Sequence, residues 1–514
     1  MFKVTPLTPT PTLSHALRHQ AASRPDAPAL CFYPARQDTH EPWITFAQAD
    51  ARVSRVAATL RQHGVTRGDR VAVRLGKSAD GILLFLGVLR AGAIYVPVNP
   101  GFTAREAGIL LEDSTPSLLI DNDAQALNLA DDTPYKIIAY GDGSADDLLN
   151  TAEPAADIQD EPQPDDYAAM LFTSGTTGRP KGAPLTHANL MSNLDALAEA
   201  WQISPDDRVL HVLPVFHAHG LFVAAAMPLS TGASLMITET FDAAQACRLL
   251  PEATVFMAVP AIYTRLLAQP GFDRRACRNL RLATSGSAPL SPEMFAALQQ
   301  AMGVTVVERY GLTETSILTS NPIDGSARVG SVGKPLSIVD LRITDAAGVP
   351  VTDGEVGSLQ ARSPATIGQY WNRPELTDDW TQDGFFDTGD MGRFDADGYV
   401  WLVGRKKELI ISGGYNVYPR EVENVLETVP GVEEAVVLGV PHPDFGEGVL
   451  AAIRCQPDER VTEAMINERA MSDLAAYKRP KAVVFVDEFP RNAMGKVMKK
   501  TLQATYAELF AQPR

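Results

Sequence analysis

The sequence predicts an α/β protein with a large N-terminal domain, residues 1–404, and a small α+β C-terminal domain, residues 405–514. The first observation is size, because 514 residues with 45% hydrophobic and 21% charged residues can bury large cores in two or three domains. The second is the alternation of short β-rich runs with helical runs, which is typical of parallel α/β layers. The third is a final segment that carries its own strand and helix patterns.

The first α/β sheet subdomain is predicted before residue 142. A helix is expected over residues 43–64, and it is followed by the alternating runs VAVRLG, ILLFLGVLRAG and AIYVPVNP. The apolar residues of that helix recur at helical spacing and are Phe46, Ala49, Val53, Val56 and Leu60. The acidic, Pro- and Ala-rich stretch 142–166 is expected to be an exposed connection between two subdomains.

The second open α/β sheet subdomain is expected from Tyr167 to about Gly330, on the runs AAMLFTSG, RVLHVLPV, SLMIT, TVFMAVP and LRLATSG. Frequent Gly and Pro with short strands over residues 330–403 predict a small β-rich subdomain. After GRKKELI, the segments EEAVVLGV, VLAAIRC and KAVVFVD predict the separate C-terminal domain.

Composition excludes several classes of function. A formal charge of −17, from 62 acidic and 45 basic residues, argues against a nucleic-acid partner. We expect no membrane association, because no apolar run reaches the length of a spanning helix, and the proline-broken N-terminus does not resemble a signal peptide. Four dispersed cysteines without a C-x-x-C pair fit a reducing cytoplasm. Small-molecule substrates are therefore expected, with a monomer or homodimer as the assembly.

The most informative segment is LFTSGTTGRPKG, residues 171–182, which follows a predicted strand. Glycines let backbone N–H groups approach phosphate oxygens, and neighbouring hydroxyls offer further donors. The order of residues differs from that of a Walker A loop. Spacing alone leaves open a flexible Gly/Ser/Thr surface loop.

TSGTTGRPKG resembles the phosphate-loop signature of the adenylate-forming superfamily, which contains acyl-CoA synthetases, nonribosomal adenylation domains and luciferases. The remaining superfamily motifs follow in order and span essentially the whole chain. They are VFHAHG (215–220), TSGSAP (284–289), ERYGLTE (308–314), TGD (388–390), GR (404–405) with GGYNVYPREV (413–422), and PRNAMGK (490–496). The resemblance implies a small mobile C-terminal domain and the use of ATP, Mg²⁺ and coenzyme A.

The resemblance also implies a nucleotide site. Its residues are Thr173, Ser174, Gly175, Thr176, Thr177, Gly178, Lys181, Ser287, Ala288, Pro289, Glu308, Arg309, Tyr310, Gly311, Thr313, Asp390 and Arg405. Within it, Tyr310 would stack on adenine, Thr313 would donate to the α-phosphate and Glu314 would ligate Mg²⁺, a cation that prefers oxygen. Taken alone, Tyr310 would instead be a core aromatic. Asp390 can accept both ribose hydroxyls, and Arg405 would contact ribose or phosphate.

Catalytic roles follow from the same resemblance. Lys496 would bridge carboxylate and ATP during adenylation, with Thr313 and Glu314 as further catalytic residues, and Lys407 would be the hinge of the C-terminal domain. Gly413 and Gly414 would line the pantetheine tunnel of CoA. His217 would lie close to the substrate carboxylate. The H-x-H pair of His217 and His219 has no third nearby ligand, so a zinc site is not favoured.

The segments FHAHGLF, VPAIYTRLL, LRLATSGSAPL, ERYGLTETSILTSNPIDG and PHPDFGEGV are most similar to the malonyl-CoA synthetases. A dicarboxylate keeps one anionic end, whose burial needs a cationic partner. Arg265 and Arg281 are the candidates, with His217, Ser285 and Gly286 also at the acid site. Methylmalonate, succinate, oxalate or acetate remain alternatives, as does a stand-alone adenylation enzyme that loads a carrier protein.

Overall fold

The computed structural model describes residues 12–35, 39–121, 133–139, 161–173, 180–491 and 496–510. The chain forms two compact units. The first comprises Met1–Asp340 with Ala361–Phe386, and the second comprises Leu341–Gln360 with Asp387–Arg514. The second unit therefore begins before residue 405, and the domain boundary expected there stays a prediction.

One sheet of the first unit has six strands in the order β6-β5-β3-β4-β7-β8. Neighbouring strands are parallel except for the hairpin of β7 and β8. The strands are β3 (Arg70–Arg74), β4 (Ile94–Pro97), β5 (Leu118–Asp121), β6 (Lys136–Ala139), β7 (Tyr167–Thr173) and β8 (Lys181–Thr186). Helices α3 (Ala79–Arg90) and α4 (Ala104–Ser114) connect its parallel strands.

The other sheet of the first unit has nine strands in the order β15-β14-β13-β12-β11-β9-β10-β1-β2. Its six central strands are parallel, and the outer strands are antiparallel. The strands are β1 (Pro28–Tyr33), β2 (Ile44–Thr45), β9 (Arg208–His211), β10 (Ser234–Thr238), β11 (Val255–Ala258), β12 (Leu282–Ser285), β13 (Val306–Leu312), β14 (Ser316–Ser320) and β15 (Lys334–Pro335). Helices α8 (Ala243–Leu249), α9 (Pro260–Leu267) and α10 (Pro292–Met302) lie between its parallel strands in sequence.

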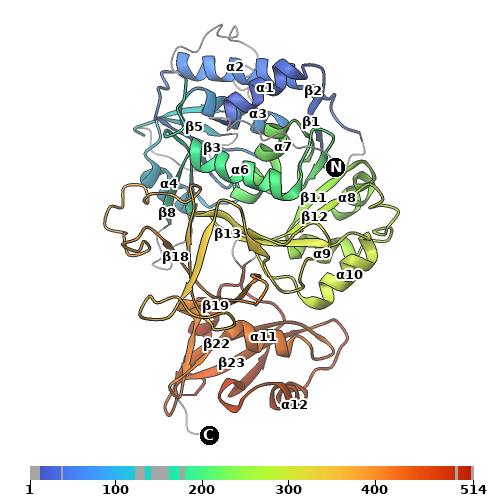
Figure 1. Cartoon of the computed structure of the whole chain (residues 1–514), viewed down its shortest axis with the longest axis vertical. Coiled ribbons are helices and arrows are strands. Elements are labelled where there is room, and N and C mark those ends of the chain that lie inside the picture. The colour runs from blue at the N-terminus through green and yellow to red at the C-terminus, as the bar shows by residue number, and fades with distance from the viewer. Residues whose placement is uncertain are drawn as a thin grey trace. The chain divides into compact units, whose positions relative to one another are not determined.

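The helix expected over residues 43–64 is α2 (Phe46–Gln62). It begins at a capping box formed by Thr45 and Gln48. All five apolar residues of its predicted stripe are fully buried. Figure 1 shows α2 beside α1 (Leu13–Ser23) and α3, and the three helices pack on one another. Helical periodicity therefore predicts both the element and its buried face.

One sheet membership differs from the prediction, and one strand was not predicted. The run AAMLFTSG was expected in the second sheet, but β7 pairs with β4 of the six-stranded sheet. β1, near the N-terminus, pairs with β10 of the nine-stranded sheet. Local periodicity identifies a strand, but its partner depends on contacts between residues far apart in the chain.

The second unit contains a four-stranded sheet in the order β16-β17-β18-β19, which is the predicted β-rich subdomain. Its strands are β16 (Asp340–Thr344), β17 (Gly357–Arg362), β18 (Phe386–Phe394) and β19 (Val400–Arg405). A five-stranded sheet follows, formed by β20 (Ile410–Ser412), β21 (Tyr415–Val417), β22 (Val432–His442), β23 (Gly446–Cys455) and β24 (Ala482–Phe485). Figure 1 shows α11 (Pro419–Leu426) over this sheet, where it contacts β22 and α12 (Glu463–Asp473). Helix α13 (Lys499–Thr505) also contacts β22. The prediction of a large α/β part and a smaller α+β part is confirmed.

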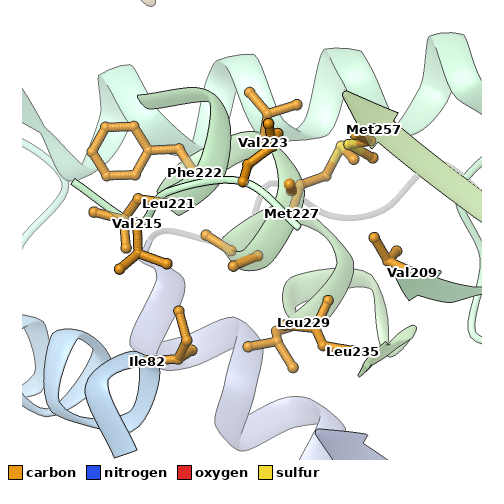
Figure 2. Packing of buried hydrophobic residues seen from close by; sticks show 14 of the residues in the cluster. Ile82, Val209, Val215, Leu221, Phe222, Val223, Met227, Leu229, Leu235 and Met257 are labelled. Carbon is orange, nitrogen blue, oxygen red and sulfur yellow. The ribbon is translucent and has the colours of Figure 1, made fainter. Parts of the chain in front are cut away.

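The segment after the FHAHG motif is a buried π-helix, His219–Ala226, which continues into α7 (Met227–Thr231). Gly220 packs so closely that a Cβ there would lie 2.0 Å from the Pro214 carbonyl oxygen. Figure 2 shows apolar side chains of this segment within the main core. The labelled residues from it and from neighbouring elements are Ile82, Val209, Val215, Leu221, Phe222, Val223, Met227, Leu229, Leu235 and Met257. π-Helical turns are frequent at functional sites, and this one holds the histidine motif against the core.

Among the described residues, no helix combines the length and the apolar character that a bilayer crossing requires.

Candidate active site at the carboxyl ends of the parallel strands

The carboxyl ends of β9, β11 and β12 lie at one edge of the nine-stranded sheet, because these strands are parallel neighbours. β9 leads into the FHAHG motif and β12 ends at Ser285 within TSGSAP. Open α/β sheets bind ligands at this edge. The topology therefore gathers motifs that are separated by about seventy residues in the sequence.

The hairpin of β7 and β8 brings Thr173, the last residue of β7, opposite Lys181, the first residue of β8. The hydroxyl of Thr173 donates to Glu314 Oε1 at 3.3 Å. Lys181 Nζ lies 3.4 Å from Asp379 Oδ2 and 4.4 Å from the centre of the Tyr370 ring. The structure thus joins the predicted phosphate loop to the ERYGLTE motif.

Tyr370 connects the two carboxylates of this cluster. Its hydroxyl oxygen lies 3.2 Å from Glu314 Oε1 and 3.2 Å from Asp379 Oδ2. One hydroxyl proton can serve only one acceptor at a time. Burial raises the pKa of Tyr370, and the negative charges of Glu314 and Asp379 raise it further. Tyr370 therefore stays a neutral donor.

The oxygen atoms around Glu314 fit a magnesium ion. Mg²⁺ is usually held by one or two carboxylates together with substrate phosphates and waters. Glu314 supplies one carboxylate beside the hydroxyls of Thr173 and Tyr370. In the described part of the chain, no group of three or more His, Cys, Asp or Glu side chains could hold a metal ion.

Arg309 on β13 is the most unusual charged residue of this region. Its side chain is buried, and its Nε and Nη2 atoms have no hydrogen-bond partner among the described residues. Burial lowers the pKa of Arg309 to about 10. A Cβ on Gly286 would lie only 2.5 Å from the guanidinium, so the absence of a side chain at Gly286 lets Arg309 reach the carboxyl end of β12.

Further buried polar atoms lie near Arg309. His219 is 8% exposed, and neither ring nitrogen has a hydrogen-bond partner within the described ranges. Burial lowers the pKa of His219 well below its usual value, and the positive charge of Arg309 lowers it further. Ser285 is fully buried, and its hydroxyl is likewise unpaired in the described part of the chain. Buried polar groups without partners are costly, so this group of atoms is suited to a polar ligand.

His217 lies between β9 and the π-helix, with its ring centre 4.6 Å from that of Phe216. It is only partly buried, unlike His219. The structure therefore distinguishes the two histidines of the H-x-H pair by burial. The role of His217 at the substrate carboxylate stays a prediction.

The predicted nucleotide residues after β12 form an exposed turn, Ser287 to Pro289, in which Ser287 has a φ of +67°. Glu308 is buried and accepts hydrogen bonds from the backbone N–H groups of Leu290 and Gly330, both at 3.3 Å. Glu308 therefore holds two loops in place. Of the remaining ERYGLTE residues, Tyr310 is 8% exposed on β13, whereas Gly311 and Thr313 are partly buried.

Arg281 does not fit the predicted role of binding the acid. It precedes β12, at the end of the strand opposite Ser285. Its guanidinium forms a bidentate ion pair with Asp207, in which Nε lies 2.7 Å from Oδ1, and it also donates to the carbonyls of Trp201 and Gln202. These partners hold the guanidinium at the amino ends of the strands, opposite the edge that carries Ser285. Arg281 therefore has a structural role.

Arg265 is exposed on α9, a helix that begins just after the carboxyl end of β11. Its guanidinium carbon lies 4.7 Å from the centre of the Phe241 ring. Phe241 follows β10, so this contact lies towards the same edge of the sheet as Ser285. Position therefore favours Arg265 over Arg281.

The second unit carries the remaining predicted residues. Asp390 and Arg405 are direct partners on β18 and β19, and Arg405 Nε lies 2.6 Å from Asp390 Oδ1. Lys407 is exposed in a short 3₁₀ turn, Lys406–Glu408. Lys496 is also exposed.

Gly413 and Gly414 form the turn between β20 and β21, with φ values of +59° and +81°. Two successive positive φ values are typical of a type I′ hairpin turn, which glycine adopts without strain. A Cβ on Gly413 would lie 3.1 Å from the Phe445 ring. Gly413 and Gly414, which are predicted to bind CoA, thus expose backbone without side chains on the second unit.

Part of the predicted phosphate loop, Ser174, Gly175, Thr176, Thr177 and Gly178, lies outside the described residues. Sequence reasoning missed Tyr370 and Asp379, which contact Glu314 and Lys181. Neither residue stands in a recognised motif, so no local signal marks them. It also assigned Arg309 to the nucleotide and did not identify it as a buried, unpaired cation.

Known proteins resemble the chain over nearly its full length. The AMP-binding enzyme family matches residues 17–371, and the AMP-binding enzyme C-terminal domain matches residues 421–496. A long-chain-fatty-acid–CoA ligase of Mycobacterium tuberculosis is 35% identical, covering 90% of this chain and 93% of that protein. Oxalate–CoA ligase of Arabidopsis thaliana is 34% identical, covering 97% of this chain and 99% of that protein. The crystal structure of ATP-bound MatB from Rhodopseudomonas palustris is 38% identical with a TM-score of 0.91, covering 97% of this chain and 100% of that chain.

The names of these relatives include a fatty acid and oxalate, so they share a reaction class but differ in the acid. Enzymes of this class use ATP, coenzyme A and Mg²⁺ with small-molecule acids. The chain belongs to the AMP-binding enzyme family, the adenylate-forming superfamily, and is an AMP-forming acid–CoA ligase.

Proposed function

We propose that the protein is a malonate–CoA ligase. It forms malonyl-CoA from malonate, ATP and coenzyme A through a malonyl-adenylate, and it releases AMP and pyrophosphate. The observation that carries this proposal is the buried guanidinium of Arg309, whose Nε and Nη2 atoms have no hydrogen-bond partner among the described residues. The resemblance of several long segments to malonyl-CoA synthetases supports the same acid.

The charge of malonate explains why Arg309 matters. Adenylation consumes one carboxylate, and the second remains anionic in a site that excludes water. Its burial is favourable only beside a cation that donates hydrogen bonds, and a guanidinium can do so with two parallel N–H groups. Within the described ranges two nitrogens of Arg309 have no partner, and the guanidinium lies against Gly286 at the binding edge of the sheet. We propose Arg309 as the main partner of the free carboxylate, with Arg265 at the outer margin.

The adenylation step joins two anions, so the protein must offset their repulsion. A malonate oxygen attacks the α-phosphorus of ATP and pyrophosphate leaves. Mg²⁺ neutralises phosphate charge when bound, and Glu314 would hold it. The backbone and hydroxyls of the 173–181 loop, with Thr313 and Lys496, stabilise the charge that develops on the phosphates. His217 orients the attacking carboxylate.

The thioester step follows at the same acyl group. The CoA sulfur attacks the carbonyl carbon of malonyl-adenylate, and AMP departs with the electrons of the broken acyl–oxygen bond. We propose that the C-terminal domain rotates about Lys407, so that the hairpin turn of Gly413 and Gly414 takes the place of Lys496. This glycine turn leaves room for pantetheine. One acid site then serves two reactions.

We place this reaction in the cytoplasm. All four cysteines are free thiols, and Cys31 and Cys277 are buried. Free thiols are typical of a reducing compartment, where both ATP and coenzyme A are available.

A pyrophosphate-release screen over C2 to C6 mono- and dicarboxylates, with and without CoA, tests the acid. Malonate is expected to give the highest kcat/KM, and AMP and malonyl-CoA should form with free CoA in the absence of any carrier protein. Highest turnover with another acid would reject malonate. Formation of malonyl-adenylate that transfers only to a carrier protein would favour an adenylation enzyme.

The variant Arg309→Met tests the anion site directly. We expect kcat/KM for malonate to fall about 100-fold or more, while acetate and butyrate change by less than about fivefold, because only malonate presents a second carboxylate. Arg281→Met is the matched control, since it removes the same charge from the opposite edge of the sheet. Equal losses for malonate and the monocarboxylates would reject the anion site.

A further inference from the structure

Lys499 lies between two carboxylates of the second unit. Its Nζ atom is 3.0 Å from Glu408 Oε2 and 3.0 Å from Glu423 Oε1. It is the first residue of α13 and follows Lys496 by three positions. Glu408 directly follows Lys407, and Glu423 belongs to α11. One ammonium group therefore connects the turn that carries the predicted hinge, a core helix and the segment that carries Lys496.

The Glu423 end of this connection is rigid. The Glu423 side chain is only 7% exposed, and its Oε1 atom also accepts the backbone N–H of Val437 on β22 at 2.9 Å. Arg420 lies 3.5 Å from its other oxygen. Burial alone would lower the pKa of Lys499, but the charges of Glu423 and Glu408 and their hydrogen bonds outweigh burial and raise it. Lys499 is therefore a permanent cation with fixed partners.

The segment between Lys496 and Lys499 is short and held at both ends. Val497 forms an isolated antiparallel bridge with Arg491, and the N–H of Met498 donates to the Pro490 carbonyl at 2.7 Å. In α13, Leu502 is 5% exposed in a small core. The exposed Lys496 thus extends from a base that these contacts and the ion pairs of Lys499 hold in place.

The charges add a second effect. Without Lys499, Glu408 and Glu423 would lie close together with no lysine between them, and like charges at short distance repel. Lys499 therefore both anchors the segment and offsets the repulsion between Glu408 and Glu423.

We infer that Lys499 is a positioning residue for the adenylation half-reaction. Through its contacts with Glu408 and Glu423, Lys499 holds Lys496 at a fixed position relative to the Lys407 turn. This inference rests on the proposed function, because it takes Lys496 as the residue that reaches ATP. It concerns the first half-reaction only, because CoA attack on the adenylate does not use Lys496.

The test measures both half-reactions of the full chain. Adenylation is followed by malonate-dependent exchange of pyrophosphate into ATP, and thioester formation is followed by adding CoA to preformed malonyl-adenylate. For Lys499→Met, we expect the adenylation kcat to fall at least tenfold, with KM for ATP and malonate within about twofold, because misplacement of a catalytic group affects the transition state rather than ground-state binding. Thioester formation should stay within about twofold of the wild-type rate.

Two further variants sharpen the test. Lys499→Arg keeps the charge between both carboxylates and should retain at least a third of the adenylation rate. Lys500→Met removes the neighbouring positive charge and should leave both half-reactions within about twofold. The inference is overturned if Lys499→Met lowers both half-reactions equally, which indicates general unfolding, or if it lowers neither.

The wild-type protein separates this inference from the proposed function. If the wild type catalyses no exchange with malonate, the malonate assignment fails, and the same variants are then assayed with the acid that does support exchange. If Lys496→Ala leaves adenylation at the full rate, the role of Lys496 fails and the inference about Lys499 fails with it.

Discussion

The guanidinium of Arg309 is buried beside Gly286, and two of its nitrogens lack partners among the described residues. An uncompensated buried charge destabilises a folded protein, and its replacement by an apolar group of similar volume is often stabilising. The same unpaired charge is what a buried carboxylate ligand requires. Stability and substrate binding therefore place opposite demands on this residue.

We predict that Arg309→Met stabilises the ligand-free protein by about 2 kcal/mol. Malonate should raise the Tm of the wild type, because a ligand that binds only the folded state stabilises it, and should not raise the Tm of the variant. Thermal unfolding with and without malonate measures both effects. A lower Tm for the ligand-free variant would show that Arg309 has stabilising partners and would contradict the assignment.

At the same scale, sequence motifs located most of the candidate residues but not their partners. The resemblance implied Glu314 as a Mg²⁺ ligand, and the structure adds its contact with Thr173 of the predicted phosphate loop. Tyr370 and Asp379 have no motif, and they join the site only through contacts across the fold. A side chain's neighbours depend on tertiary packing, which a local pattern does not contain.

At the scale of elements, Arg281 connects the start of β12 to Asp207, which directly precedes β9. Asp207 is 3% exposed, and its Oδ1 also accepts the hydroxyl of Thr254 at 2.7 Å. Burial alone would raise the pKa of Asp207, but the hydrogen bonds from Arg281 and Thr254 and the charge of Arg281 lower it. This group of contacts holds the amino ends of neighbouring strands together.

We predict that Arg281→Met lowers the free energy of unfolding by about 3 kcal/mol, because it leaves the Asp207 carboxylate buried without its cation. The KM for malonate should stay within about twofold. Urea unfolding and steady-state kinetics measure the two quantities. A selective loss of malonate activity with unchanged stability would restore Arg281 as a substrate residue.

Helix α6 (His187–Trp201) carries an ionisable residue that opposes folding at neutral pH. Asp195 has no hydrogen bond or ion pair within the described ranges, and burial raises its pKa from 3.8 to about 6. The folded state therefore binds more protons than the unfolded state between these values, so stability falls as pH rises through about 6.

We predict that Asp195→Asn stabilises the protein at pH 7 to 8 by about 1 kcal/mol. A shift of about two pH units corresponds to roughly 3 kcal/mol, and partial exposure of the side chain reduces this value. The difference should shrink below about pH 6 and become small near pH 4, where Asp195 is protonated in the folded state and partly protonated in the unfolded state. Denaturant unfolding at pH 4, 6 and 8 measures the difference in stability between the variant and the wild type. A difference that does not change with pH would contradict burial of the Asp195 carboxylate as its cause.

Element types followed closely from the sequence, whereas strand partners did not. The buried stripe of α2 and the strands around the motifs agree with the predicted patterns. β7 was assigned to the wrong sheet, because its apolar run fits either of two parallel sheets. Pairing is decided by long-range packing and by the connections available to the chain.

At the scale of the whole molecule, the proposed catalytic residues are divided between two compact units. The residues proposed to bind the acid and the phosphates belong to the first unit, and Asp390, Arg405 and Lys496 belong to the second. Each unit has its own hydrophobic core. This division is consistent with a reaction in which the second unit contributes different residues to successive steps.

We predict that Lys496→Ala separates the two half-reactions. Adenylation should fall by about 100-fold or more, because one cation that stabilises both anions is lost. CoA attack on preformed malonyl-adenylate should be retained in large part. Pyrophosphate exchange and single-turnover thioester formation measure the two steps, and full-rate adenylation would remove Lys496 from the mechanism.

The sequence by itself determined the fold class, the order of the motifs and the reaction class, because these depend on short patterns that a linear chain displays. Tertiary structure alone decided which sheet each strand joins, that Arg281 is held by Asp207, and that Arg309 is buried with two nitrogens that have no partner in the described part of the chain. The predicted α/β fold and the acid–CoA ligase class are confirmed, and the proposed main anion partner is Arg309 in place of Arg265 or Arg281. The physical reason is that burial and charge pairing are properties of residues brought together from distant parts of the chain.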